Sequence, residues 1–262
     1  MKGRSLTYPA YLELETLLSL QRPRSAPVEH DEMLFIVVHQ VYELWFRQLL
    51  HELDALCVGL VAGDHTCAFR TLRRLCTILK TLVGQVDVLE TMSPTSFRSF
   101  RTRLEAASGM ESSQFREIEL ACGHKQKAHV TRIEDPTTRE RLERRLEQPS
   151  VYDAFLRYLV RRGQAVPCAL LERNVSEPIE PSEALQAVLL DVYRRDPGTA
   201  QICELLVDLD EGFQEWRYRH VKMVERTIGN RRGTGGSAGV EYLRGTLFKP
   251  FFPDLWAIRD QL

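Results

Sequence analysis

The spacing of apolar residues is the feature that most constrains the fold of this 262-residue chain. Along residues 31–60, 66–90 and 205–224, apolar side chains recur three or four positions apart, which places them on one face of an α-helix. Alternating patterns typical of strands are scarce. The sequence therefore predicts an all-α fold. Two of the helical faces carry a histidine: Phe35, His39, Tyr42, Phe46, Leu49 and Leu53 form one, and Leu205, Leu209, Phe213, Trp216, His220 and Val224 the other.

Capping residues and chain breakers predict where the helices begin and end. Asp31 is suited to cap the first long helix, and Ser93 followed by Pro94 is typical of the start of a short one. Ser150 is a further N-cap, and Gly123 marks a helix end. The predicted helices cover about residues 31–60, 66–90, 94–104, 111–122, 151–163 and 182–194, with a last long helix that ends at Gly229.

A single domain is expected to span residues 1–262, because the length suits one large domain and no internal repeat divides it. With 44% hydrophobic and 27% charged residues, the chain can bury a sizeable core. Residues 123–149 are charged and poorly patterned, which favours a mobile excursion. The glycines of GNRRGTGGSAG, residues 229–239, are typical of irregular backbone.

Charge and cysteine content argue against several classes of function. Lys plus Arg number 35 and Asp plus Glu 36, and this net charge of −1 is not that of a nucleic-acid binder. The six cysteines form no Cys-x-x-Cys pair, as zinc or redox motifs would require. No apolar run reaches the roughly 18 residues that span a bilayer, and the N-terminus lacks a signal-peptide pattern. These features predict a cytoplasmic protein with no nucleic-acid or membrane partner.

His39 and His220 are the candidate metal ligands. Either one alone would be an ordinary core residue. Two on the inward faces of separate long helices indicate a cofactor site, because bundles build such sites from facing side chains and histidine commonly holds haem iron. Three arrangements are open: both ligate one haem, one ligates while the other lines a pocket, or both join carboxylates at a non-haem metal. The missing Glu-x-x-His pattern weakens the third.

Two further segments carry side chains suited to a substrate. FRSFR, residues 97–101, places Phe97 and Arg101 one helical turn apart, and arginine binds carboxylates through paired hydrogen bonds. A structural salt bridge is the alternative role for Arg101. The glycine-rich GTGGSAG can present backbone N–H groups and the hydroxyls of Thr234 and Ser237 to an anion. A flexible linker is the alternative for this loop.

Several stretches of the sequence, in the order of the family, resemble the tryptophan 2,3-dioxygenases. They are YPAYLEL, HDEMLFIVVHQVYELWFRQLLHELD, VLETMSPTSFRSFR with SGMESSQFR behind it, PSVYDAFLRYL, and WRYRHVKMVERTIGNRRGTGGSAGVEYLR. The resemblance extends from about residue 8 to the C-terminus. The combination of HQVYELWF, RHVKMVERTIG and GTGGS is specific to the family, whereas GTGG alone is not.

This resemblance implies a helical, haem-dependent homotetramer that inserts both atoms of O₂ into the indole ring of L-tryptophan, giving N-formylkynurenine. By matching position, it implies that His220 is the proximal haem ligand. His39 matches the distal, catalytic histidine that hydrogen-bonds the indole N–H. Arg101 matches the anchor of the substrate carboxylate, and Thr234 the hydroxyl that receives the ammonium group together with a haem propionate.

The resemblance also implies roles for residues around these four. Phe35, Phe97 and Leu104 match the apolar walls of the indole pocket, Ser108 is expected to bind substrate, and Gly235 is expected to contact the haem. Residues 1–30 are expected to form an N-terminal arm that is exchanged between subunits. In this arm, Tyr8 and Tyr11 match tyrosines that reach into the neighbouring subunit's pocket.

The chain departs from the family pattern at two places near the substrate loops. Met110-Glu111 stands where the family has Phe-Gln, and Ala238 where it has a second serine. These departures leave open a haem-dependent monooxygenase that converts a tryptophan derivative to an oxindole. A non-catalytic haem electron carrier or gas sensor is a third hypothesis, against which Phe97, Arg101 and Thr234 argue, because such a protein needs no clamp for an amino acid.

Overall fold

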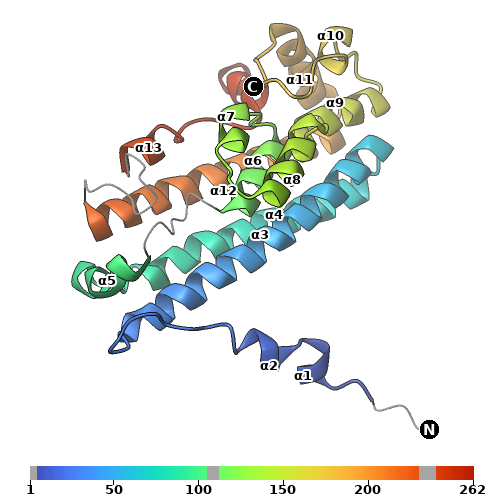
Figure 1. Ribbon diagram of the computed structural model, residues 1–262. Helices are drawn as coiled ribbons and strands as arrows, with labels where there is room; N and C mark the ends of the chain where they lie inside the picture. The colour runs from blue at the N-terminus through green and yellow to red at the C-terminus, as the bar shows by residue number, and fades with distance from the viewer. Residues whose placement is uncertain (1–4, 105–111, 230–239) are drawn as a thin grey trace.

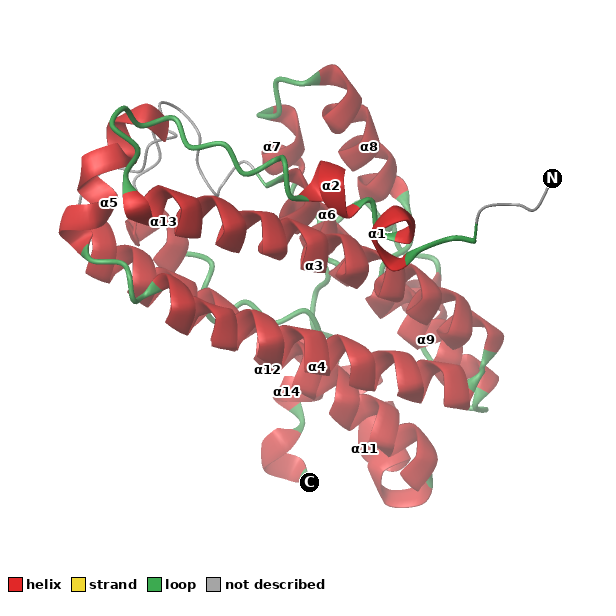
Figure 2. Ribbon diagram, turned by 90° about the horizontal axis from the view of Figure 1, so that it is seen from below, coloured by secondary structure: helices red, strands yellow, loops and turns green. Residues whose placement is uncertain are grey.

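The computed structural model describes residues 5–104, 112–229 and 240–262 (Figure 1). All regular secondary structure within these ranges is helical, so the all-α prediction is confirmed (Figure 2). Three long helices form the centre: α3 (His30–Ala62), α4 (His65–Leu89) and α12 (Pro197–Ile228). Both α3 and α12 pack along α4, as the two views agree.

The apolar faces of the long helices form one continuous core, as their spacing predicted. Side chains buried between α3, α4 and α12 include Leu49, Leu53, Leu56, Leu72, Leu79 and Phe213. Two shorter helices, α6 (Ser113–Cys122) and α9 (Val151–Arg161), pack against α3 and extend this core. Burial of so much apolar surface is the main stabilising contribution to a bundle of this kind.

Local capping interactions explain several of the helix boundaries, whereas α3 begins at His30 after Glu29 and contains the predicted cap Asp31 in its first turn. The Ser93 hydroxyl accepts a hydrogen bond from Ser96 N at 3.0 Å and begins α5 (Pro94–Arg101), which continues as the 3₁₀ turn η1 (Thr102–Leu104). Ser150 begins α9 through a reciprocal capping box with Asp153. Helix α6 ends at Gly123, whose φ of +111° favours glycine.

The C-terminal segment is held to α12 by a buried carboxylate. Asp210 accepts hydrogen bonds from Phe251 N at 2.8 Å, from Phe252 N at 3.1 Å and from Trp256 Nε1 at 3.0 Å. This segment forms α14 (Pro253–Ala257), which packs on α11 (Glu183–Arg195). The remaining short elements are α1 (Tyr8–Tyr11), α2 (Leu14–Leu17), α10 (Cys168–Leu171), α13 (Val240–Arg244) and η3 (Arg259–Gln261).

Residues 123–149, for which the sequence favoured a mobile excursion, contain two short helices. They form α7 (Lys127–Thr131) and α8 (Pro136–Glu147), which enclose a small separate core of Leu120, Val130, Leu142 and Leu146. The buried ammonium group of Lys125 donates to three carbonyl oxygens at the end of α8, those of Arg145, Leu146 and Gln148, at 3.0, 3.1 and 2.7 Å. A core of so few apolar side chains gives little periodic signal, which is why the pattern did not predict these helices.

The N-terminal residues run away from the helical body as an arm (Figure 1). At the base of the arm, the buried carboxylate of Glu32 accepts hydrogen bonds from Arg24 N at 2.6 Å, from Ser25 N at 3.0 Å and from the Ser25 hydroxyl. Gln21 is bonded to Gln40 of α3. No helix among the described residues is long and apolar enough to cross a membrane.

Candidate active site

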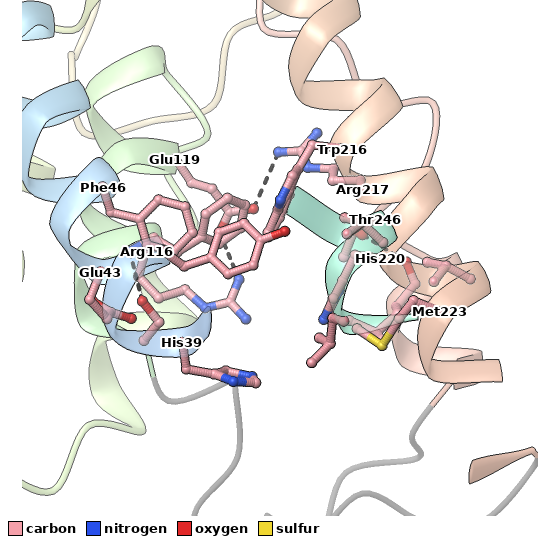
Figure 3. Close-up of a pocket in the computed structure, with 17 residues that line it drawn as sticks. His39, Glu43, Phe46, Arg116, Glu119, Trp216, Arg217, His220, Met223 and Thr246 are labelled. Atoms are coloured by element: carbon pink, nitrogen blue, oxygen red, sulfur yellow. Dashed lines mark hydrogen bonds and ion pairs between the residues drawn. The ribbon is translucent and has the colours of Figure 1, made fainter. Parts of the chain in front are cut away.

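The two candidate histidines face one cavity from opposite walls. His39 projects from α3 and His220 from α12, and Figure 3 shows both side chains pointing into the space between the helices. The enclosed part of the cavity has a volume of about 100 Å³, and it opens to solvent between the helices. Its walls are mostly apolar and include Tyr42, Phe46, Val86, Leu89, Phe115 and Trp216.

A backbone hydrogen bond orients His39. Its Nδ1 lies 2.7 Å from the carbonyl oxygen of Phe35, one turn earlier on α3. Because a carbonyl only accepts, we assign the proton of the neutral ring to Nδ1, which leaves Nε2 as a hydrogen-bond acceptor. Burial lowers the pKa of His39 despite this bond and the nearby Glu43 carboxylate. The Nε2 atom of His39 can therefore accept a hydrogen bond from an N–H or O–H group of a ligand in the cavity.

His220 is also a neutral imidazole. Burial, with a further contribution from His39, lowers its pKa to about 4. None of the described residues forms a hydrogen bond with the His220 ring, which stacks instead on Trp216 with ring centroids 5.3 Å apart. A neutral imidazole keeps a nitrogen lone pair free for a metal ion, which is the form in which histidine ligates haem iron.

These residues fit a haem. The cavity offers the neutral imidazoles of His220 and His39 within mostly apolar and aromatic walls, and a haem would need such a nitrogen ligand and such walls. Over the same described ranges, no three His, Cys, Asp or Glu side chains are grouped so that they could hold a metal ion by themselves. The non-haem arrangement therefore has no support among these residues.

A second cavity adjoins the predicted substrate residues. Phe97 and Arg101 of α5 line it together with Ile228 and Gly229 at the end of α12, and it encloses about 1200 Å³ of space open to solvent. Phe35 lies between one residue of each cavity, since its ring centroid is 4.0 Å from that of His39 and 5.7 Å from that of Phe97. Leu104 is partly buried against the same core. The structure thus brings Phe35, His39 and Phe97 together.

Other predicted site residues lie elsewhere or outside the described ranges. Tyr8 and Tyr11 are 72% and 71% exposed on α1 and line neither cavity of their own chain. Ser108, Thr234 and Gly235 fall in the residues that the structure does not describe, as do Met110, Glu111, Ser237 and Ala238.

Two further polar residues of α3, Gln40 and Glu43, lie within its apolar stretch. Gln40 bonds to the end of the arm, with its Nε2 3.4 Å from the carbonyl oxygen of Leu20. Glu43 does reach a neighbouring helix, because its Oε2 accepts a hydrogen bond from Gln114 Nε2 of α6 at 2.8 Å. The polar residues within the apolar stretch 34–46 are therefore all partnered.

Sequence reasoning missed a buried ionic cluster at the inner end of the first cavity. Glu119 accepts from Arg116 Nη1 at 2.6 Å and from Arg217 Nη2 at 3.2 Å (Figure 3). Burial alone would raise the pKa of Glu119, but the two guanidinium groups outweigh it and hold the pKa below its usual range. The available signal was positional: Arg116 ends the SSQFR stretch, and Arg217 lies beside Trp216.

His124 extends this cluster and makes its stability depend on pH. Its Nδ1 is 3.3 Å from Arg217 Nη2, and its Nε2 is 3.2 Å from the carbonyl oxygen of Pro250. Burial and the adjacent Arg217 charge lower the pKa of His124 to about 4. Between pH 4 and pH 6.5, the His124 imidazole is therefore mostly neutral in the folded protein and mostly protonated in the unfolded chain.

We expect this difference in protonation to lower the free energy of unfolding in acid. The pKa of His124 is about 4 in the folded protein and about 6.5 in the unfolded chain. The contribution of neutral His124 to stability is therefore fully present above pH 6.5 and is lost as the pH falls toward 4. His124→Gln should reduce that loss in the free energy of unfolding by about 3 kcal/mol. Denaturant unfolding between pH 7 and pH 4 measures the difference. The exposed His51→Gln is the control, and equal pH dependence in both variants would contradict the role of His124.

Comparisons with known proteins agree with the resemblance. The family model described as tryptophan 2,3-dioxygenase matches residues 1–163 and 147–262. A tryptophan 2,3-dioxygenase of Herpetosiphon aurantiacus is 56% identical over 260 residues, which are 99% of this chain and 100% of the relative. One from Anaeromyxobacter sp. strain K is 56% identical over 259 residues, 98% of this chain and 97% of the relative. One from Bacillus thuringiensis is 40% identical over 263 residues, with 98% and 93% covered.

Proposed function

Because the chain belongs to the tryptophan 2,3-dioxygenase family, we propose that it binds haem through His220 and oxidises the indole ring of L-tryptophan with O₂ to N-formylkynurenine. The observation that carries the proposal is the pair of neutral imidazoles facing one apolar cavity from α3 and α12. The two rings have different surroundings. His39 is bonded to a backbone carbonyl, whereas the His220 ring stacks on Trp216.

These surroundings support different roles for the two histidines. The unprotonated Nε2 of His39 is suited to accept the indole N–H of the substrate. His220 is left to hold the iron as the proximal ligand. Ferrous haem supplies the activation of O₂, and the protein supplies orientation and exclusion of water.

The second cavity supports the binding of an amino-acid substrate. Phe35 and Phe97 offer two aromatic faces, with ring centroids 5.7 Å apart, between the catalytic histidine and Arg101. We propose that these rings and Leu104 contact the indole and that Arg101 binds the carboxylate. On the resemblance alone, Ser108 and Thr234 complete the substrate site and Gly235 contacts the haem. A mostly apolar pocket with few polar groups at its ends suits a substrate with a ring at one end and charges at the other.

Isotope labelling of the product tests the reaction. The haem-loaded protein is reduced without oxygen and mixed with L-tryptophan and ¹⁸O₂. The mass of the product is then measured by mass spectrometry. We expect N-formylkynurenine that contains two labelled atoms. One labelled atom in an intact oxindole ring, with turnover that depends on added reductant, would contradict dioxygenation and establish the monooxygenase. The same assay with ring- or β-methylated tryptophans defines the substrate range.

A spectrum of the ferrous protein tests the non-catalytic hypothesis. If His220 alone ligates the iron, the ferrous haem is five-coordinate and high-spin. If both histidines ligate it, as in an electron carrier, the haem is six-coordinate and low-spin. A low-spin spectrum together with no turnover of tryptophan would contradict the proposed enzyme.

We also propose that the chain acts as a homotetramer whose arms are exchanged between subunits. Tyr8 and Tyr11 are exposed on an arm that runs away from its own body, and such a chain end stays ordered only when it docks. Leu6 and Leu18 of the same arm are 70% and 71% exposed, so the arm presents apolar surface to a partner. We place the enzyme in the cytoplasm, since all six cysteines are unpaired thiols.

Deletion of residues 1–12 should reduce activity at least about tenfold, because a neighbour's pocket would lose both tyrosines. Haem content and the fold of each subunit should be retained, since the contacts of Glu32 lie beyond the deletion. Turnover, the Soret absorbance and circular dichroism measure the three quantities. Deletion of residues 1–5, which stops before Tyr8, is the control. Full activity after removal of residues 1–12 would refute the shared site.

A further inference from the structure

The ring of His220 is held by an aromatic contact. Trp216 precedes His220 by one turn on α12, and the indole and imidazole planes are inclined by only 2° with centroids 5.3 Å apart. Metal-ligating histidines usually donate their second ring N–H to a carboxylate, a carbonyl or water, and that bond fixes the orientation of the ring. His39 has such a bond to Phe35, whereas none of the described residues provides one for His220.

Trp216 is itself fixed by rings from two other helices. Its indole lies 5.9 Å from the ring of Phe46 at 86° and 6.2 Å from that of Tyr42 at 67°, both on α3. Phe115 of α6 contacts it at 4.8 Å. Trp216 is only 9% exposed. The two contacts from α3 are edge-to-face, a preferred arrangement of aromatic pairs, and Phe115 adds a tilted contact from α6, so both helices hold the indole plane.

We propose that Trp216 is a positioning residue that sets the orientation of the His220 imidazole toward the haem iron. The inference rests on the proposed binding of haem by His220. The parallel indole restricts rotation of the imidazole about its bond to the helix, in place of the usual second hydrogen bond. Through this contact, the packing of α3 and α6 determines how the ligand on α12 is presented.

Two substitutions separate the flat face of Trp216 from its volume. Trp216→Phe keeps an aromatic face, whereas Trp216→Met fills most of the space with a flexible side chain that cannot stack in one plane. Trp45→Met removes a partly buried tryptophan of α3 that does not line the cavity, and it is the control. Each variant is prepared with haem, and its fold is checked by circular dichroism and thermal unfolding.

The principal readout is the iron–histidine stretching band of the ferrous protein in resonance Raman spectra. We expect Trp216→Met to broaden or shift this band and to speed haem loss about tenfold, near the upper end of what an aromatic pair contributes. Trp216→Phe should restore most of the wild-type behaviour, and Trp45→Met should match the wild type. An unchanged band and unchanged haem loss in a folded Trp216→Met variant would overturn the proposal.

A measurement on the wild type keeps the test independent of how the variants fold. In the haem-loaded ferrous protein made diamagnetic with carbon monoxide, nuclear Overhauser contacts between the ring protons of Trp216 and His220 should be present, and their absence would overturn the stacking. The proposed function is judged separately. If His220→Ala leaves the iron–histidine band in place, His220 is not the ligand. If that band depends on His220 but not on Trp216, only the positioning role fails.

Discussion

Replacing His220 with alanine should abolish stable haem binding. In the proposed site His220 alone ligates the iron from a mostly apolar cavity, and alanine offers the iron no ligand. Loss of a residue that only supports a metal ligand costs about 10–100-fold in affinity, so loss of the ligand itself should cost more than about a hundredfold. The Soret absorbance and the ratio of haem to protein after purification measure the effect.

Two other histidines provide the controls for this experiment. His51→Ala alters an exposed position on the same helix as His39 and should retain full haem content. His39→Ala should also retain haem, while turnover falls because the indole N–H loses its acceptor. Full haem occupancy with unchanged ligation in His220→Ala would contradict the assignment. Equal loss of haem in His39→Ala and His220→Ala would instead indicate that both histidines ligate.

Replacing Arg101 with leucine should impair substrate binding and leave haem content unchanged. Arg101 is only partly buried where it lines the second cavity, so we expect the lower end of the cost of breaking a charge pair, about 2 kcal/mol. That corresponds to a fall in kcat/KM of about thirtyfold. Steady-state kinetics with L-tryptophan measure the fall, and the Soret absorbance reports haem content.

A neighbouring arginine separates the specific role of Arg101 from a general effect of charge. Arg103 is exposed in the following 3₁₀ turn, and Arg103→Leu removes the same charge two positions away. Its kcat/KM should stay within about twofold of the wild type. The kcat/KM for tryptamine, which lacks the carboxylate, should change little in the Arg101→Leu variant. Near-native kinetics with L-tryptophan in Arg101→Leu would exclude the carboxylate anchor.

The long helices were predictable because local signals and burial agree in them. The pattern of residues 31–60 corresponds to α3 at His30–Ala62, and that of residues 66–90 to α4 at His65–Leu89. The Ser93, Ser150 and Gly123 boundaries are confirmed, because a cap acts on backbone groups within the same turn. Helices α7 and α8 were not predicted, since their stability depends on a small core shared with α6 and on the bonds of Lys125.

The spacing of apolar residues did not predict the ionic cluster either, for a related reason. Charged residues are rarely buried, so a pattern places Arg116, Glu119 and Arg217 on solvated faces. They are buried here because α6 and α12 bring opposite charges within hydrogen-bond distance, which offsets the cost of desolvation. This pairing of opposite charges cannot be inferred from α6 or α12 considered separately.

The all-α class, the long helices and the family of the chain could be inferred from the order of residues alone. The same order also placed His39 and His220 on inward faces, because a helical face follows from spacing along one segment. The packing of the helices was needed to show that the two imidazoles share a cavity and that Phe35 lies between His39 and Phe97. It was also needed to show that Trp216 stacks on His220 and contacts rings of α3 and α6. These relations depend on how separate helices pack, since a side chain's partners across a bundle come from residues far apart in the chain.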